Sequence, residues 1–230
     1  MSLLPANFPV GQLSPAGVSK LEWFYRNHVE AYYTEYKFGH FLMAGYAAVP
    51  ALLTPELLYK TWQNFNAYRW QGAPASIHPI AVSDILLSPL CNEVGYELYE
   101  MDQEIKLAML EWLTIIENDK KTLWSKRGIH TIGSIAGFIH DYHSLPNSGQ
   151  VRWGKTYTEW QEVDALSYLD PELAASRLLK TMTEQSAGKQ EMELLRTLEQ
   201  FIKTQQKLNR IHPGNRRPAN AFNQNIDQLE

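Results

Sequence analysis

Residues 81–113, AVSDILLSPLCNEVGYELYEMDQEIKLAMLEWL, decide the fold that we expect for this chain. The first part spaces its apolar residues as one face of a helix does, at Val82, Ile85, Leu86 and Leu90. Residues 96–101 then alternate with period two after a glycine, which is typical of a short half-buried strand. Asp102 is placed to cap a second helix, in which the apolar positions are Ile105, Met109, Leu110 and Leu113. Because two further helices precede it, this helix–strand–helix order predicts a winged-helix unit.

The rest of the chain predicts a mainly α fold, with that one short β element and a helical C-terminal region. A capping residue followed by proline marks three helix starts, at Ser14, Thr54 and Asp170. We expect further helices over residues 15–36, 38–49, 55–65, 120–126, 129–143, 157–168, 171–182 and 190–208. Glycine and proline predict a surface loop over residues 66–79 and a linker over residues 145–154.

These elements group into four expected parts. An N-terminal arm and an aromatic helix occupy residues 1–37, and the winged-helix-like unit occupies residues 38–117. A helical region follows over residues 118–209. Residues 210–230 are polar and rich in asparagine, which predicts a disordered tail.

The charge of the chain argues against nucleic-acid binding. With 21 lysines and arginines against 25 aspartates and glutamates, the formal net charge is −4. Phosphate binding requires clustered lysine and arginine. The expected recognition helix and strand instead carry acidic side chains, at Asp84, Glu93, Glu97, Glu100 and Asp102. Such a surface repels DNA.

Composition also bears on the compartment. The longest apolar run, residues 41–53, is shorter than the roughly 20 residues of a membrane-spanning helix. The N-terminus shows no secretory signal. The single cysteine, Cys91, excludes an internal disulfide framework and fits a reducing compartment. We therefore expect a cytoplasmic protein that does not enter membranes.

Five segments of the chain resemble a known family. They are GHFLMA (39–44), LTPELLY (53–59), AVSDILLS (81–88), GYELYEMD (95–102) and ALSYLDPE (165–172). In this order they resemble a helical, winged-helix-containing module of large bacterial, often cyanobacterial, signalling and conflict proteins. In that family the module accompanies sulfatase-modifying-factor-like, caspase-like, TIR or NTPase domains. The resemblance covers residues 38–208, and YELYEM is its most specific string.

The resemblance implies a regulatory or adaptor role and a protein partner. The winged-helix segment is also similar to the one that follows the nucleotide-binding core of signal-transduction NTPases. This chain departs from the family because it carries no attached effector or NTPase and no G-x-x-x-x-G-K-[ST] phosphate loop. The resemblance therefore implies a partner in trans, such as an effector or NTPase encoded nearby.

His140 and His143 are the clearest indication of an enzyme. Three residues apart on a helix, two imidazoles share a face and are able to bind one metal ion. His130 or His40 would supply a third ligand. The alternative is a polar helix end, where a histidine near the last carbonyls is favourable.

Two other groups of residues have both chemical and structural interpretations. A nucleophilic Cys91 needs a partner base and a depressed thiolate pKa, whereas its apolar neighbours indicate a buried thiol. Glu97 and Glu100 form either a general acid–base pair, a solvated face or an acidic recognition strip for a basic partner.

Aromatic and acidic side chains are the candidates for partner contact. Tryptophan and tyrosine concentrate in interface hot spots, although they also fill cores. The candidate partner-binding residues are Glu97, Tyr99, Glu100, Trp153, Tyr157 and Trp160. The aromatic residues of the N-terminal helix occur around much of its circumference, which favours packing against the chain or against a second subunit.

The sequence thus favours a non-enzymatic adaptor in a bacterial signalling or antiviral defence system, acting by protein–protein contact and without a cofactor. Two alternatives stay open. One is a winged-helix regulator that binds DNA, and the other is a metal-dependent hydrolase centred on His140 and His143.

Overall fold

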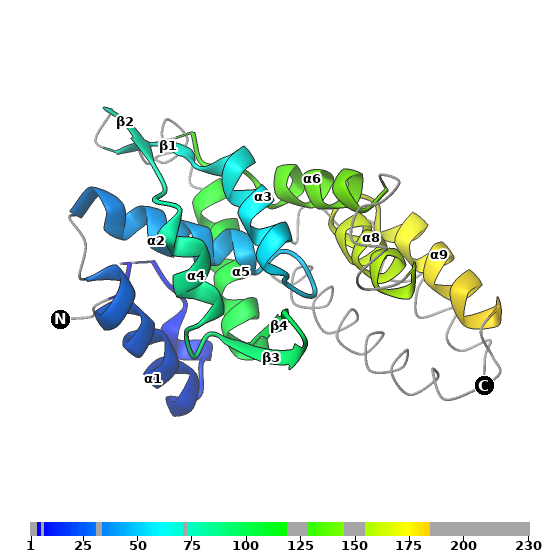
Figure 1. The fold of residues 1–230 in the computed structure, drawn as a ribbon, viewed down its shortest axis with the longest axis horizontal. Helices are drawn as coiled ribbons and strands as arrows, with labels where there is room; N and C mark the ends of the chain where they lie inside the picture. The colour runs from blue at the N-terminus through cyan, green and yellow to red at the C-terminus, as the bar shows by residue number, and fades with distance from the viewer. Residues whose placement is uncertain are drawn as a thin grey trace. The chain divides into compact units, whose positions relative to one another are not determined.

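The computed structural model describes residues 4–5, 7–30, 34–70, 73–118, 128–144 and 155–184. The described chain is mainly helical and carries two short antiparallel strand pairs, which confirms the predicted mainly α class (Figure 1). It forms two compact units, Met1–Phe138 and Ile139–Glu230. The expected arm, aromatic helix and winged-helix segment all belong to the first of these units.

The first unit begins with a short 3-10 helix η1 (Val10–Gln12), the helix α1 (Pro15–Phe24) and a π-helical turn η2 (Tyr25–Val29). Ser14 caps α1 as predicted, because its hydroxyl accepts a hydrogen bond from the Gly17 amide at 3.2 Å. The expected helix boundary between residues 36 and 38 is wrong. The next helix, α2, runs without interruption over Thr34–Ala47.

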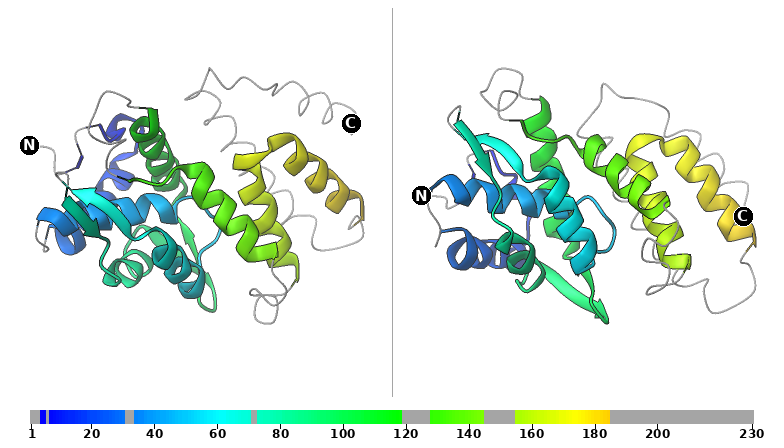
Figure 2. Two further views of the ribbon diagram at one scale, coloured as in Figure 1. Left: turned by 90° about the horizontal axis from the view of Figure 1, so that it is seen from above. Right: turned by 45° about the horizontal axis from the view of Figure 1, so that its top comes forward.

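Helix α2 is the centre of the first unit. It contacts η2 and the helices α3 (Pro55–Phe65), α4 (Ile80–Leu86) and α5 (Gln103–Asn118). Figures 1 and 2 show α3, α4 and α5 arranged around it. Every residue from 38 to 50 is buried. Gly45 allows α5 to approach closely, since a Cβ atom there would lie 3.1 Å from Leu113 Cδ2. The Phe41 ring meets the Trp112 ring edge-on at 4.8 Å.

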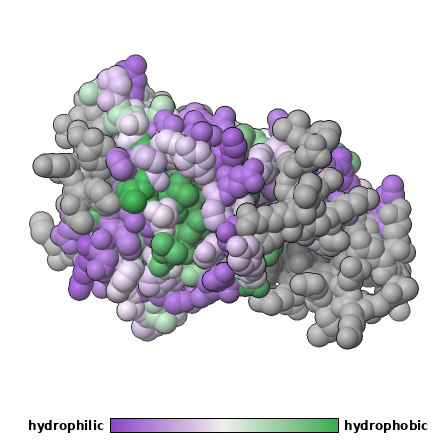
Figure 3. Space-filling view, in the orientation of Figure 1, coloured by the Kyte–Doolittle hydropathy of each residue, from purple (hydrophilic) through white to green (hydrophobic). Residues whose placement is uncertain are grey.

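The expected order of a helix, a short β element and a second helix is present around this centre, with a hairpin in place of the single strand. After α2, Leu53 forms a β-bridge with Tyr99, and α3 and α4 follow. The strands β3 (Cys91–Gly95) and β4 (Leu98–Met101) then form an antiparallel hairpin. Strand β4 therefore pairs with β3 in a two-stranded sheet and with Leu53 through a single bridge. Figure 3 shows hydrophobic surface over the position that α4 occupies in Figure 1.

Two features of this region differ from expectation. The sequence does not predict strand β3, because its apolar spacing extends the preceding helix to Leu90, whereas α4 ends at Leu86. Residues 66–79 are not simply a loop either, since β1 (Ala67–Trp70) pairs antiparallel with β2 (Ala73–Ser76). A two-stranded hairpin tolerates a proline such as Pro74 because each strand keeps an edge without a ladder partner.

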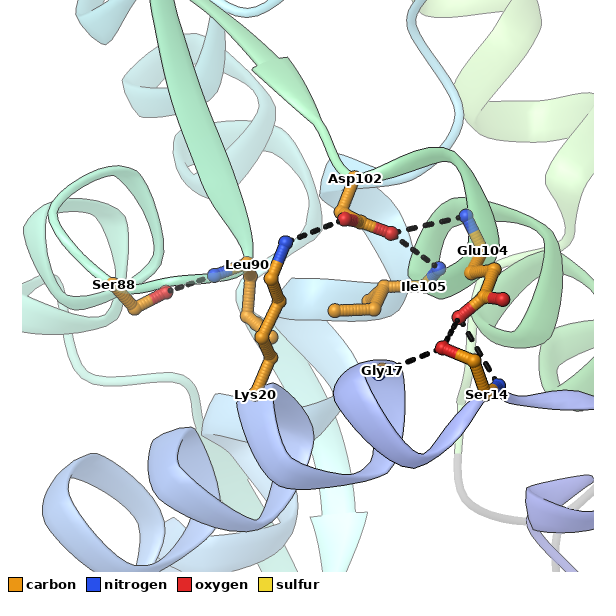
Figure 4. A network of polar contacts seen from close by, with 8 residues as sticks. All are labelled: Ser14, Gly17, Lys20, Ser88, Leu90, Asp102, Glu104 and Ile105. Carbon is orange, nitrogen blue, oxygen red and sulfur yellow. Dashed lines mark hydrogen bonds and ion pairs between the residues drawn. The ribbon is translucent and has the colours of Figure 1, made fainter.

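The end of the β3–β4 hairpin is tied to α1 and α5 by a polar network (Figure 4). Asp102 Oδ1 accepts hydrogen bonds from the amides of Glu104 and Ile105 at 3.1 and 3.4 Å, so Asp102 caps α5 as predicted. Its Oδ2 forms an ion pair with Lys20 Nζ of α1 at 2.6 Å. Glu104 in turn accepts the Ser14 hydroxyl at 2.8 Å.

In the second unit, helix α8 (Lys155–Leu169) packs against α9 (Pro171–Glu184). Asp170 caps α9 as predicted, accepting the Leu173 amide at 3.0 Å. The core of this pair consists of Val163, Leu166, Ala174 and Leu178. The predicted helix at 129–143 is present as α6 (Ile132–Ser144), and the division between the two units falls within it.

Several expected segments lie outside the described residues. They are the helices at 120–126 and 190–208, the linker at 145–154 and the tail at 210–230. Within the part of the chain that is described, none of the helices is long and apolar enough to cross a membrane.

The network in Figure 4 predicts that Asp102 stabilises the first unit in two separable ways. Asp102→Ala removes both the helix cap and the ion pair with Lys20, and should lower the free energy of unfolding by about 1–2 kcal/mol. Asp102→Asn keeps a capping oxygen and should cost about 0.5 kcal/mol. Urea unfolding of the full chain, followed by circular dichroism, measures both. Adding Lys20→Met to Asp102→Asn should cost nothing further, and equal losses for the alanine and asparagine variants would contradict this assignment.

Candidate functional site

The outer side of α4 and the adjoining β3–β4 hairpin form the strongest candidate site, named here the α4–hairpin surface. Four large apolar side chains are exposed on it, Ile80 by 39%, Leu87 by 75%, Val94 by 50% and Tyr96 by 75%. The hairpin also carries the acidic residues Glu93, Glu97 and Glu100. Glu93 pairs with Tyr99 and Glu100 with Asn92, so these two carboxylates lie on opposite faces of the hairpin. Helix α4 contacts β3, so the two elements are neighbours in the fold.

The amphipathic sequence of α4 explains its exposed side. Ile80 and Leu87 are seven residues apart and therefore lie on one side of the helix. The opposite side consists of Ala81, Val82, Ile85 and Leu86, which are all buried. Burial of this inner side holds α4 on the first unit. The exposed apolar residues at its two ends are not required for that packing.

The register of the hairpin decides where its side chains lie. Cys91 pairs with Met101, and both are buried at the base. Further out, Glu93 lies opposite Tyr99, and residues directly opposite each other share a face of the sheet. The pairing register between β3 and β4 shifts at Val94. Such an irregularity changes the direction in which the exposed side chain of that residue leaves the strand.

The turn of the hairpin contains a strained residue. Glu97 has φ 52°, in the left-handed region, where a non-glycine residue costs on the order of 1 kcal/mol. Hydrogen bonds at the base of the hairpin offset this cost. There the backbones of Tyr99 and Leu53 exchange two hydrogen bonds of 2.8 and 2.9 Å. Glu97, Tyr99 and Glu100 are each half-buried. The more exposed side chains, Val94 and Tyr96, were not among the predicted residues.

Asp84 on α4 does not belong to the exposed acidic surface, contrary to expectation. Its Oδ1 lies 3.2 Å from His28 Nδ1 of η2, and its Oδ2 lies 3.1 Å from His40 Nε2 of α2. His40 is fully buried, and the His28 ring packs against Trp23 with 5.3 Å between ring centroids. One carboxylate therefore joins α4 to two other elements. Nothing in the sequence indicates that Asp84 pairs with His28 and His40.

The two histidines proposed as metal ligands differ in burial, although Glu162 acts on both of them. His140 Nε2 lies 3.5 Å from Glu162 Oε1, and its Nδ1 lies 3.3 Å from Asp141 Oδ1. His143 is buried, and its ring meets the Tyr157 ring at 5.7 Å. Burial lowers the pKa of His143 to about 4, although the charge of Glu162 acts in the opposite direction. Among the described residues, no three histidine, cysteine or acidic side chains are arranged to hold a metal ion.

The suggested third ligands are engaged within the first unit. His40 pairs with Asp84, as described above. The His130 ring packs edge-on against Phe65 at 4.8 Å, and burial lowers its pKa. The His130 amide also donates a hydrogen bond to the Tyr46 hydroxyl at 3.1 Å.

Cys91 is a buried thiol at the start of β3. It is 8% exposed, and burial raises the pKa of its thiol to about 12. A nucleophilic cysteine needs the opposite, a lowered pKa that supplies thiolate near neutral pH. The surroundings of Cys91 therefore fit a buried structural thiol better than a catalytic nucleophile.

The aromatic candidates of the C-terminal region differ from those of the hairpin. Trp160 is partly buried against the α8–α9 core. The Tyr157 hydroxyl accepts a hydrogen bond from Gln161 Nε2 at 3.0 Å, and its ring contacts His143. Both therefore contribute to the interior of the second unit. Trp153 lies outside the described residues.

Comparisons with known proteins add no identification. Neither a family model, nor a curated protein, nor a solved structure matches this chain. The resemblance to bacterial signalling modules therefore stays a prediction, and the function has to be inferred from the site itself.

The environment of His143 predicts that acid destabilises the second unit. The unfolded chain protonates this imidazole near its ordinary pKa of about 6.5, whereas the folded pKa is about 4. Between these values the unfolded state binds more protons, so the free energy of unfolding falls as the pH is lowered through this window. Urea unfolding at about pH 7.5 and about pH 5 measures how steeply the free energy of unfolding changes with pH. His143→Phe should reduce this slope, and an unchanged slope in His143→Phe would be inconsistent with this account.

The buried thiol predicts a slow reaction with thiol reagents. At about pH 8 a pKa near 12 leaves so little thiolate that Cys91 should react on the order of a thousandfold more slowly than an ordinary cysteine. The rate of labelling by a chromogenic disulfide measures this, and denaturant should restore fast labelling. The matched control is Cys91→Ala with Asn92→Cys, which moves the thiol to the exposed neighbouring position. Equal rates for the two chains would show that Cys91 is accessible and ionised.

Proposed function

We propose that this protein is a non-enzymatic adaptor that binds a protein partner through the α4–hairpin surface. One observation carries the proposal, namely that four large apolar side chains lie exposed on two adjoining elements, of which α4 is buried along its inner side and the hairpin is buried at its base. Single exposed apolar residues are ordinary on protein surfaces, whereas a group of them on neighbouring elements is typical of an interaction site. Tyrosine, present here as Tyr96, is also enriched among hot spots.

The fixed position of the two elements supports this proposal. Asp84 ties α4 to His28 and His40, and the pairing of Tyr99 with Leu53 holds the base of the hairpin. A preorganised surface loses less conformational entropy when a partner binds. The strained backbone of Glu97 is consistent with a residue retained for contact and not for stability.

The same surface is poorly suited to the alternative of DNA binding. Winged-helix and helix-turn-helix proteins place a recognition helix in the major groove and hold the phosphates with cations. Helix α4 and the hairpin contain no lysine or arginine. Their apolar and acidic side chains match a protein surface better than a phosphate backbone.

We place the adaptor in a bacterial signalling or antiviral defence system of the cytoplasm, with an effector or NTPase as its partner. The resemblance over residues 38–208 supports the system and the class of partner. A single cysteine, kept as a buried thiol, is compatible with a reducing compartment.

Site-specific photocrosslinking tests the proposal in the native host. With p-benzoylphenylalanine in place of Tyr96, illumination should give one discrete protein adduct, because a bound partner lies within reach of that side chain. Leu87→Asp in the same chain should abolish the adduct, since it introduces a charge into the apolar contact. The same photoreactive residue in place of Tyr59, an exposed tyrosine of α3, should give none. Absence of an adduct at position 96, or an equal adduct with Leu87→Asp, rules this surface out.

A further inference from the structure

The outer edge of β3 presents main-chain groups to solvent. Among the described residues, β3 pairs with β4 alone, in a sheet of two strands. Figure 1 shows β3 along the lower margin of the first unit, and residues 92–95 are all exposed. The edge of a sheet carries N–H and C=O groups that are able to pair with a further strand.

The hydrogen bonds of the hairpin decide which groups are open. In an antiparallel pair, the N–H and C=O of one residue point to the same side, and successive residues alternate. Tyr99 gives both of its groups to Leu53, so they point away from β3. Glu93 lies opposite Tyr99, and its N–H and C=O therefore point away from β4. The Cys91 carbonyl points to the same open side, whereas the Cys91 amide donates to the Ser88 carbonyl at 3.2 Å.

This edge lacks two common means of protection. Edge strands are often shielded by proline or by charged side chains, lysine above all. The other hairpin has both a cation and a proline, with Arg69 in β1 and Pro74 in β2. Strand β3 has neither, and its one charged residue, Glu93, is the residue with open main-chain groups. Val94, which is 50% exposed, follows directly and adds an apolar contact at the edge.

From this arrangement we infer that an extended segment of the protein partner adds to the open edge of β3 as a further strand. This inference rests on the proposed function of the α4–hairpin surface. Three main-chain groups are available to the segment, the N–H and C=O of Glu93 and the C=O of Cys91. In strand addition, main-chain hydrogen bonds supply affinity, and side chains that meet the neighbouring surface supply specificity.

A second copy of the chain fits this edge less well than a different protein. Two identical strands pair about a twofold axis, so that each residue faces its symmetry-related counterpart. In the register that uses both main-chain groups of Glu93, this residue lies opposite Glu93 of the second copy. Like charges directly opposite each other are destabilising. A helical segment would leave the open groups of β3 unpaired, because its own backbone groups are already bonded.

Selection from a random peptide library, displayed on phage, tests the inference with the full chain as bait. One parallel selection uses Glu93→Pro, which removes the open N–H but no hydrogen bond to β4, and proline is tolerated at such edge positions. Another uses Leu87→Asp with Tyr96→Ala, which removes apolar contacts of the surface. Peptides enriched on the unchanged chain should be lost in both.

The other outcomes of the selection separate the two proposals. Peptides that need Leu87 and Tyr96 but tolerate Glu93→Pro would overturn the inference and leave the proposed function standing. Peptides that do not need Leu87 and Tyr96, or no enrichment at all, would overturn both.

A scan of one enriched peptide with single N-methylated amides shows whether it binds as a strand. Alternate residues of an added strand face β3, and the three open groups engage two peptide amides. Methylation should weaken the binding of the fluorescently labelled peptide about tenfold or more at two positions, separated by one position where it changes little. Equal sensitivity at consecutive amides, as a helical peptide would show, contradicts strand addition.

The matched control for Glu93→Pro is Glu93→Ala, which removes the side chain but keeps the N–H. The alanine variant should bind the peptide within about twofold of the unchanged chain, whereas the proline variant should bind about tenfold more weakly or worse. Slow thiol labelling of Cys91 in the proline variant checks that the base of the hairpin is intact, and the N-methyl scan does not depend on that variant. Equal losses in both variants would overturn the inference, as would a dimer of the chain that Glu93→Pro dissociates.

Discussion

The burial of α2 on every side from residue 38 onward is the constraint on which the first unit depends. From residue 38 to residue 50 the chain is shielded from water, so neighbouring elements must cover the whole circumference of the helix. That requirement brings η2, α3, α4 and α5 together around one axis. His40 is a polar group within this apolar helix, and a buried imidazole needs a partner. Asp84 supplies it, and this pairing ties α4 to α2.

Much of the fold was predictable from local sequence signals. Ser14-Pro15, Thr54-Pro55 and Asp170-Pro171 start helices where caps and prolines predict them, and Asp102 caps α5. The extents of α2 and β3 were not predictable in the same way. Glycines and a uniformly apolar run hide the periodicity of α2. Strand β3 exists because it pairs with β4, and a pairing between segments leaves little trace in the residues of one of them.

The candidate site was predicted only in part, for a related reason. The sequence indicated the hairpin acids, but it grouped Asp84 and Asp102 with them as one negative surface. Both are used inside the fold, because His28, His40 and Lys20 approach them from distant parts of the chain. Tyr96 was assigned to a strand, whereas it lies in the turn between β3 and β4, where its side chain is exposed. Contacts between segments decide which charged and aromatic residues reach the surface.

If the protein acts as the proposed adaptor, the shortness of α4 has a kinetic consequence. A helix of 7 residues is about 10 Å long, and with a small hairpin it offers a modest footprint. Long-lived complexes bury about 800 Å² on each partner, so an association confined to this footprint belongs to the transient class. Complexes of that class dissociate quickly, so each partner stays bound for only a short time. Such a module would exchange partners readily, and lasting recruitment would come from tethering several weak contacts, since linked sites raise the effective concentration.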